Sequence, residues 1–115
     1  MADYTPIDEV AAHRHPILPD SEHYKIVRCL YDFNHEIREN TITLTLVHRS
    51  NRTRRYLRFS GVSGCEPLEG HFGIYILDTS YRQWEQRVRV EVGEFYEDGG
   101  VYFRAESVQE IPPND

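Results

Sequence analysis

Apolar and polar residues alternate strictly through the middle of the chain. From residue 41 to residue 46 each threonine is followed by an aliphatic residue, and the alternation resumes at residues 56–59 as Tyr-Leu-Arg-Phe. A period of two positions is typical of a β-strand that buries one face. Polar residues 49–54 lie between the two stretches. The pattern therefore predicts two strands joined by a polar loop.

The two predicted strands can pair so that their apolar sides face the same way. Folding the chain around Asn51–Arg52 places Leu46 opposite Leu57, and it places Leu44 opposite Phe59. Cross-strand apolar pairs of this kind stabilise a sheet and select its register. We therefore predict a β-hairpin with one apolar face and an arginine-rich tip.

A second hairpin is predicted near the end of the chain. Valines alternate with charged residues at positions 88–92, and Asp98-Gly99-Gly100 has the composition of a tight turn. In this hairpin the valines would share the buried face with residues 101, 103 and 105, and Gly93 would form a bulge. The opposite face would be exposed, with cross-strand ion pairs of low energy. Its residues are Arg89, Glu91, Arg104 and Glu106.

The remaining segments add strands and one helix. Residues 23–33 and residues 72–77 are apolar at both odd and even positions, which is typical of a central or sandwiched strand. Thr5-Pro6, followed by two acidic residues within three positions, predicts a short helix that ends at His15-Pro16. Residues 78–86 fit a wide loop as well as a helical turn, and of the two we favour one helical turn.

Together these segments predict a mainly β fold. We expect about six mostly antiparallel strands in a sandwich or partly open barrel, with one short N-terminal helix. The length is that of a single domain, spanning residues 1–115. Within it, residues 1–20 form the helix and an extended linker, residues 21–111 form the β domain, and residues 112–115 form a frayed tail.

The composition indicates a globular protein. Hydrophobic residues make up 39% of the chain and charged residues 28%. No apolar run approaches the length of about 20 residues that a membrane helix needs, and acidic residues stand where a signal peptide would be basic and apolar. We therefore expect a cytoplasmic protein without a membrane partner, either a monomer or a homodimer. Cys29 is interpreted as a small buried hydrophobe.

The charge is unevenly distributed. The formal net charge is −6, yet residues 40–65 contain five arginines and no acidic residue. Arginine and tyrosine are favoured at the centres of protein interfaces, and an arginine beside an aromatic ring also suits phosphates and bases. The predicted partner-binding residues are Arg49, Arg52, Arg54, Arg55, Tyr56 and Arg58.

Three interpretations of this basic segment compete. It is a protein-binding surface, a weak site for single-stranded nucleic acid, or a solvated loop that keeps the protein soluble. The negative net charge disfavours nucleic acid, because long-range repulsion opposes the approach of a polyanion. We therefore predict a protein partner, with nucleic acid as the alternative. A small-ligand binder or a metal-dependent enzyme with its site in a barrel-like cavity is a third alternative.

Catalytic and metal-binding motifs are missing from the sequence. It contains neither a GxSxG motif nor a Cys–His signature for a nucleophile. The densest histidine group is His13, His15 and His23, and its spacing matches no common zinc motif. We predict that the protein is not an enzyme, with no catalytic residues, no metal site and no cofactor.

The first hairpin also resembles a known class of proteins. The segments TITLTLVHRS and RRYLRFSGVSGCEPL are similar to small bacterial immunity-type proteins, in which an alternating strand, a short loop and a strand of the form LxFxGV recur. The resemblance covers about 25 residues and includes Phe59-Ser60-Gly61-Val62. It implies a protein that neutralises a partner toxin by binding it, without catalytic residues. The resulting hypothesis is a non-enzymatic protein-binding domain that acts as an inhibitor or immunity factor by masking its partner.

Overall fold

The computed structural model describes residues 5–34, 39–62, 70, 73–82, 87–95 and 100–112. These residues form one α-helix, one short 3-10 helix and seven strands. The helices are α1 (Ile7–Ala12) and η1 (Ser21–His23). The strands are β1 (Tyr24–Asn34), β2 (Glu39–His48), β3 (Arg54–Ser60), β4 (Ile74–Asp78), β5 (Val90–Glu94), β6 (Val101–Ala105) and β7 (Ser107–Glu110).

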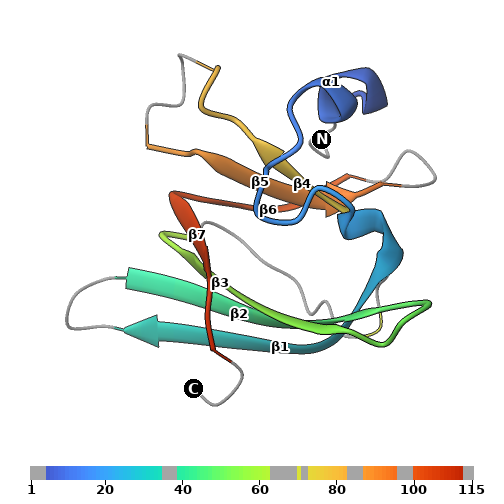
Figure 1. Ribbon diagram of the computed structural model, residues 1–115. Helices are drawn as coiled ribbons and strands as arrows, with labels where there is room; N and C mark the ends of the chain where they lie inside the picture. Colours follow the sequence, from blue (N-terminus) through green and yellow to red (C-terminus); the bar gives the residue numbers. More distant parts are fainter. Residues whose placement is uncertain are drawn as a thin grey trace.

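The strands form two antiparallel sheets that lie face to face (Figure 1). The larger sheet has the order β1-β2-β3-β7 and the smaller has the order β4-β5-β6. Only Glu106 separates β6 from β7, so the chain passes from one sheet to the other there. The predicted mainly β fold is confirmed, and of the two architectures left open it is the sandwich, since the described strands form no closed barrel.

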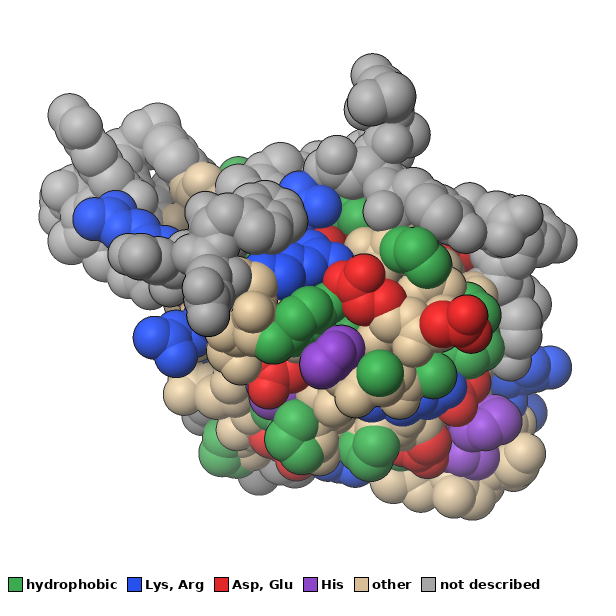
Figure 2. Space-filling model, turned by 90° about the horizontal axis from the view of Figure 1, so that it is seen from above, with side chains coloured by type: hydrophobic (Ala, Val, Ile, Leu, Met, Phe, Trp, Pro, Cys, Tyr) green, Lys and Arg blue, Asp and Glu red, His purple; other side chains and the backbone are tan. Residues whose placement is uncertain are grey.

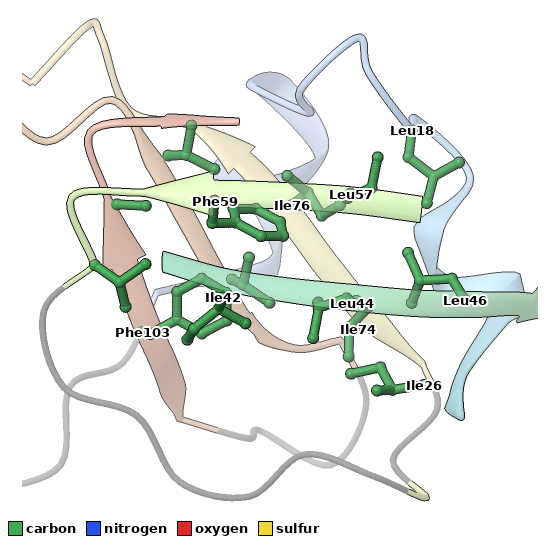
Figure 3. Packing of buried hydrophobic residues seen from close by; sticks show 14 of the residues in the cluster. Leu18, Ile26, Ile42, Leu44, Leu46, Leu57, Phe59, Ile74, Ile76 and Phe103 are labelled. Carbon is green, nitrogen blue, oxygen red and sulfur yellow. The ribbon is translucent and has the colours of Figure 1, made fainter. Parts of the chain in front are cut away.

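The hydrophobic core lies between the two sheets (Figure 3). Ile42, Leu44 and Leu46 of β2 point into it, as the alternation predicts, and each has no exposed surface. The ring of Phe59 in β3 meets that of Phe103 in β6 edge to face, with 5.0 Å between ring centroids. This contact joins the two sheets, because the rings come from different ones.

The predicted register of the first hairpin is wrong by two residues. The structure pairs Leu44 with Leu57, and it pairs Ile42 with Phe59. A shift of two positions keeps every side chain on its face, so the predicted apolar face is correct although the partners are not. The cause is the turn, which closes one residue earlier than expected: the His48 amide donates to the Thr53 carbonyl oxygen at 2.9 Å.

The second hairpin buries the expected face. Val90 pairs with Ala105 and Val92 with Phe103, and all four side chains are buried. The predicted bulge at Gly93 is confirmed by the register shift there. The predicted turn at residues 98–99 lies outside the described residues.

The outer face of that hairpin is not the exposed one that we expected. Glu91 has no exposed surface, because helix α1 and Thr5, which precedes the helix, cover the small sheet. Val10 of α1 packs with Tyr75 and Leu77 of β4, so both faces of β4 are buried, as its sequence predicts. Thr5 does not cap the helix; its hydroxyl donates to Glu91 instead.

Strand β1 differs from its prediction as a central strand. It lies at the edge of the larger sheet, and Val27, Leu30 and Tyr31 are 42%, 49% and 52% exposed. A register shift between Ile26 and Arg28 breaks the alternation, so apolar residues at both parities do not mean two buried faces here. The partly buried Cys29 packs against the core, close to its interpretation as a buried hydrophobe.

The connections complete the description. Residues 16–20 follow turns instead of the expected extended linker, and Ser80 and Tyr81 form a turn. Residues 83–86 lie outside the described part, as does Cys65. Within the described part, no helix is long and apolar enough to cross a membrane.

Candidate binding face

The outer faces of the two sheets differ in how they are covered. Helix α1 lies over the outer face of β4-β5-β6 (Figure 1). On that side acidic, apolar and histidine side chains are mixed, and no single type dominates the surface (Figure 2). No described helix packs against the opposite outer face, which belongs to β1, β2 and β3. A sheet face on which no helix packs can present its side chains to a partner.

The residues of this second face follow directly from the strand alternation. Because Ile42, Leu44 and Leu46 point into the core, the three threonines of β2 point outward, and Arg58 and Tyr56 stand opposite two of them on β3. Arg28 and Leu30 of β1 stand opposite the same two threonines from the other side. The result is a row of threonines with arginine, tyrosine and leucine on either side. We call this surface, together with the turn that joins β2 and β3, the basic face.

The basic face is hollowed over the middle of the sheet. A depression of about 480 Å³ has a floor of Thr43 and Thr45. Its aliphatic and aromatic walls come from three parts of the chain: β1, β3 and the residues after β7. The residues that line it are Val27, Arg28, Leu30, Thr43, Thr45, Arg54, Tyr56, Ile111 and Pro112.

A second depression adjoins the first at Val27. It measures about 350 Å³ and lies beside the turn between β2 and β3. Its lining residues are Lys25, Val27, Val47, His48, Arg49 and Arg52. The described linings of the two depressions therefore include five cationic side chains and no acidic one. This local charge is opposite to the net charge of the chain, −6.

The arginine turn is held in shape by its own hydrogen bonds. The Nδ1 atom of His48 accepts from the amides of Ser50 and Asn51 at 3.1 and 3.3 Å. Asn51 in turn accepts from the Thr53 amide at 2.9 Å, and Arg52 adopts a positive φ of 63°. The Arg49 amide donates to the His23 carbonyl oxygen, which ties the turn to the start of β1. A turn with this many local bonds presents its arginines with little ordering cost on binding.

The structure brings five of the six predicted site residues together and separates one. Arg49 and Arg52 line the smaller depression, Arg54 and Tyr56 line the larger one, and Arg58 lies further along the same face. Arg55 has the core-facing parity of Leu57 and Phe59.

Arg55 makes an ion pair with Glu110 and also donates to the Ile17 carbonyl oxygen. The hydrogen bond to Glu110 raises the pKa of Arg55, and the same bond lowers the pKa of Glu110. Since this pair joins β3 to β7 and the linker, we assign Arg55 a role inside the fold.

Sequence reasoning missed the part of the basic face that comes from β1. Lys25, Val27, Arg28 and Leu30 belong to a segment that was interpreted as a buried central strand. The two basic residues on that strand were a usable signal, because lysine and arginine seldom lie on a buried strand. Ile111 and Pro112 were missed because they follow the last predicted strand.

A second group of polar residues lies under α1 and needs a separate explanation. Both carboxylate oxygens of Glu91 are saturated: Oε2 accepts from Thr5 Oγ1 at 2.6 Å and from the Tyr75 hydroxyl at 2.8 Å. Oε1 accepts from Arg82 Nη1 at 2.9 Å and from Arg104 Nε at 3.0 Å. Gly93 makes room for the Tyr75 ring, since a Cβ there would lie 2.4 Å from the Tyr75 hydroxyl oxygen.

The buried glutamate is a structural anchor and not a general base. Burial alone would raise the pKa of Glu91, but the four hydrogen bonds outweigh it and lower the pKa below its usual value. A carboxylate that is fully paired and held ionised has no free position for a proton from a substrate. The group instead fastens Thr5 and, through Arg82 and Glu9, helix α1 to the small sheet.

The remaining chemistry-bearing residues that the structure describes do not assemble into a site. Within the described residues, no group of three or more His, Cys, Asp or Glu is placed to hold a metal ion. His13 stacks on Tyr81 with 3.7 Å between ring centroids, and His15 accepts from the Ile17 amide through Nδ1. These two histidines therefore have packing roles.

The chain matches none of the protein-family models, curated proteins or solved structures with which it was compared. The resemblance of the first hairpin to immunity-type proteins thus remains an expectation. The function is inferred from the basic face alone.

Proposed function

We propose that the protein is a non-enzymatic protein-binding domain that recognises an acidic surface of its partner through the basic face. One observation carries this proposal: two adjoining depressions lie on a sheet face against which no described helix packs, and their described linings hold five cations and no acid. Arginines placed around apolar residues are typical of the centres of protein interfaces. Binding of this kind needs no reacting group, and it would mask the partner's surface as an inhibitor or immunity factor does.

The character of the lining favours protein over nucleic acid. The walls of the depressions include aliphatic residues beside the cations, among them Val27, Leu30 and Ile111. Tyr56 is the only aromatic ring in their described linings, apart from the imidazole of His48. Single-stranded nucleic acid is usually bound on several stacked aromatic rings. A polyanion would also extend beyond the basic face into the field of an acidic molecule, whereas an acidic patch on a partner need not.

The proposal can be tested by charge reversal on the basic face. Peptides selected from a random display library against the wild-type protein are expected to be rich in acidic and apolar residues. The variant Arg52→Glu with Arg54→Glu is expected to lose at least about tenfold in affinity for them. Its melting temperature should be nearly unchanged, because both side chains are exposed and neither packs in the core.

A matched control separates local from global charge. Arg87→Glu with Arg89→Glu makes the same change of net charge at two other exposed positions, away from the basic face. This variant is expected to bind the selected peptides like the wild type. Equal loss in both variants would mean that only net charge matters and would refute the basic face as the binding site.

Nucleic acid is tested with a mixed-sequence single-stranded oligonucleotide. We expect no binding at physiological salt. Micromolar binding that is abolished by Arg52→Glu with Arg54→Glu, with a log–log salt slope of about −3 for some four phosphate contacts, would instead identify a nucleic-acid site.

A further inference from the structure

The larger depression of the basic face is one strand wide at its floor. Thr43 and Thr45 of β2 form the floor, and the walls rise from the two neighbouring strands. Leu30 of β1 stands opposite Thr43 on one side, and Tyr56 of β3 stands opposite Thr45 on the other. Since adjacent strands are about 4.8 Å apart, the two walls stand on strands about 10 Å apart. An α-helix is about 10–12 Å across with its side chains, so the depression admits single side chains and not a helix.

An irregularity in β1 enlarges one of these walls. The register shifts between Ile26 and Arg28, and Val27 lies at the shift. Val27 and Arg28 are consecutive, yet both are exposed and both line the larger depression. In a regular strand consecutive side chains point to opposite faces, so the bulge is what brings both of them to this face. One wall therefore presents an apolar side chain and a guanidinium group next to each other.

Two arginines lie on opposite walls of the larger depression. Arg28 belongs to β1 and Arg54 to β3, and both are exposed. Arg28 is level with Tyr56, because both pair with Thr45, whereas Arg54 lies two residues before Tyr56. A separation of two strands across the sheet and two residues along it places the two Cα atoms about 12 Å apart. Neither arginine forms an ion pair with a described residue of its own chain.

We propose that the larger depression binds an extended acidic segment of the partner protein, in which one aromatic residue has an acidic residue two positions before it and another two positions after it. In an extended chain, residues two positions apart point to the same side, and the two acidic residues are about 13 Å apart. This spacing matches that of Arg28 and Arg54, and the aromatic residue between them enters the depression. The inference rests on the proposed function and names the chemistry that the partner presents.

The lining favours an aromatic side chain over an aliphatic one. A ring in the depression can stack on Tyr56 and can receive the guanidinium groups of Arg28 and Arg54 on its faces, and an aliphatic side chain makes neither contact. Val27 and Leu30 exclude water from its edges. Aromatic residues in such pockets supply most of the energy of many protein interfaces, and charged residues at the rim add specificity.

Two synthetic peptides of the same composition test the spacing. The first is Gly-Gly-Asp-Ser-Phe-Ser-Asp-Gly-Gly. In the second, Gly-Asp-Ser-Gly-Phe-Gly-Ser-Asp-Gly, each aspartate is three positions from the phenylalanine and points to the other side of an extended chain. Fluorescence anisotropy of the labelled peptides is expected to show at least about tenfold tighter binding of the first. Equal affinity for the two peptides, or no binding of the first up to about 1 mM, would overturn the proposal.

Filling the depression tests the aromatic anchor without a change of charge. Thr43→Trp places a large side chain on the floor, and tryptophan is well accommodated in strands. This variant is expected to bind the first peptide at least about tenfold more weakly than the wild type. Thr41→Trp is the matched control, because it makes the same change on β2 at a position that does not line the depression. The control is expected to bind like the wild type, and equal loss in both variants would overturn the proposal.

A charge exchange tests the pairing of Arg28 without altering the floor. Arg28→Glu should weaken binding of the first peptide at least about tenfold. Replacing one of its two aspartates with lysine should restore the affinity for this variant, and the aspartate concerned gives the direction of the bound segment. If neither lysine peptide recovers, or if Thr43→Trp and Arg28→Glu bind the first peptide like the wild type, the inference is overturned. The proposed function would still stand in that case, provided that Arg52→Glu with Arg54→Glu weakens binding of the selected acidic peptides.

Discussion

Replacing Glu91 with alanine is expected to destabilise the protein by about 3–5 kcal/mol, the usual cost of removing one member of a buried ionic network. The substitution removes the carboxylate that accepts hydrogen bonds from Arg82, Arg104 and the Tyr75 hydroxyl beneath α1. Arg82 retains its ion pair with Glu9, and this contact limits the loss. Denaturant unfolding monitored by fluorescence measures the change.

The matched control is Glu94→Ala, on the same strand. Glu94 is only partly buried, so its replacement should change the free energy of unfolding by less than about 0.5 kcal/mol. A cost below about 1 kcal/mol for Glu91→Ala would contradict the assignment of Glu91 as the anchor of α1.

The lowered pKa of Glu91 also predicts how the stability of the protein changes as the pH falls. The folded state lowers the pKa of Glu91, so below the usual glutamate pKa of about 4.3 the unfolded chain binds the proton more readily. The contribution of Glu91 to stability is therefore complete above that pH and is lost as the pH falls toward the folded pKa. Wild-type stability should decline over this range, and the variant Glu91→Ala should decline less. Parallel pH profiles of the two proteins would contradict the assignment.

Replacing Phe59 with alanine should cost a similar amount, about 3–5 kcal/mol. The ring is fully buried and meets Phe103 across the two sheets. Its removal leaves a cavity at the contact that joins them. Tyr56→Ala is the control in the same strand, because Tyr56 lies on the basic face and is only partly buried. The expected cost there is about 1 kcal/mol or less.

A double-mutant cycle measures the interaction energy between Phe59 and Phe103. Phe59→Ala and Phe103→Ala together should cost less than the sum of the two single variants, since the second substitution removes a contact that the first has already lost. Strict additivity, or a cost below about 1 kcal/mol at Phe59, would contradict the arrangement of the core.

The alternation of Ile42, Leu44, Leu57 and Phe59 was enough to predict which side of the first hairpin is buried. The register was not predictable in the same way, because a shift by two keeps every side chain on its face. What selects it is the turn, where the His48 ring nitrogen binds two amides and Arg52 takes a positive φ. No pattern of apolar residues contains that information.

Most errors in the sequence predictions concern faces whose burial depends on elements that are distant in the sequence. Glu91 alternates with valines as an exposed residue would, and only the fold shows that α1 lies over it. Tyr31 and Leu30 look like core residues in the sequence, yet β1 is an edge strand that leaves them half exposed. Whether a face is covered depends on elements distant in the chain, and local periodicity does not report on them.

The candidate site was partly predictable for the same reason. The cluster of arginines on β3 and the preceding turn is local in sequence, so it was found. The residues of β1 that complete the basic face are brought there by strand pairing alone, as the pairs of Arg28 with Thr45 and Leu30 with Thr43 show.

The most direct test of the proposed function is to map where a selected acidic peptide contacts the protein. Amide chemical shifts of the isotope-labelled protein would be followed by NMR during titration with the peptide. The changes are expected in β1 near Val27, along Thr43 and Thr45, and from Arg49 to Tyr56. Changes confined to α1 and the strands β4 and β5 would contradict the account, because they would place the binding site on the opposite face of the sandwich.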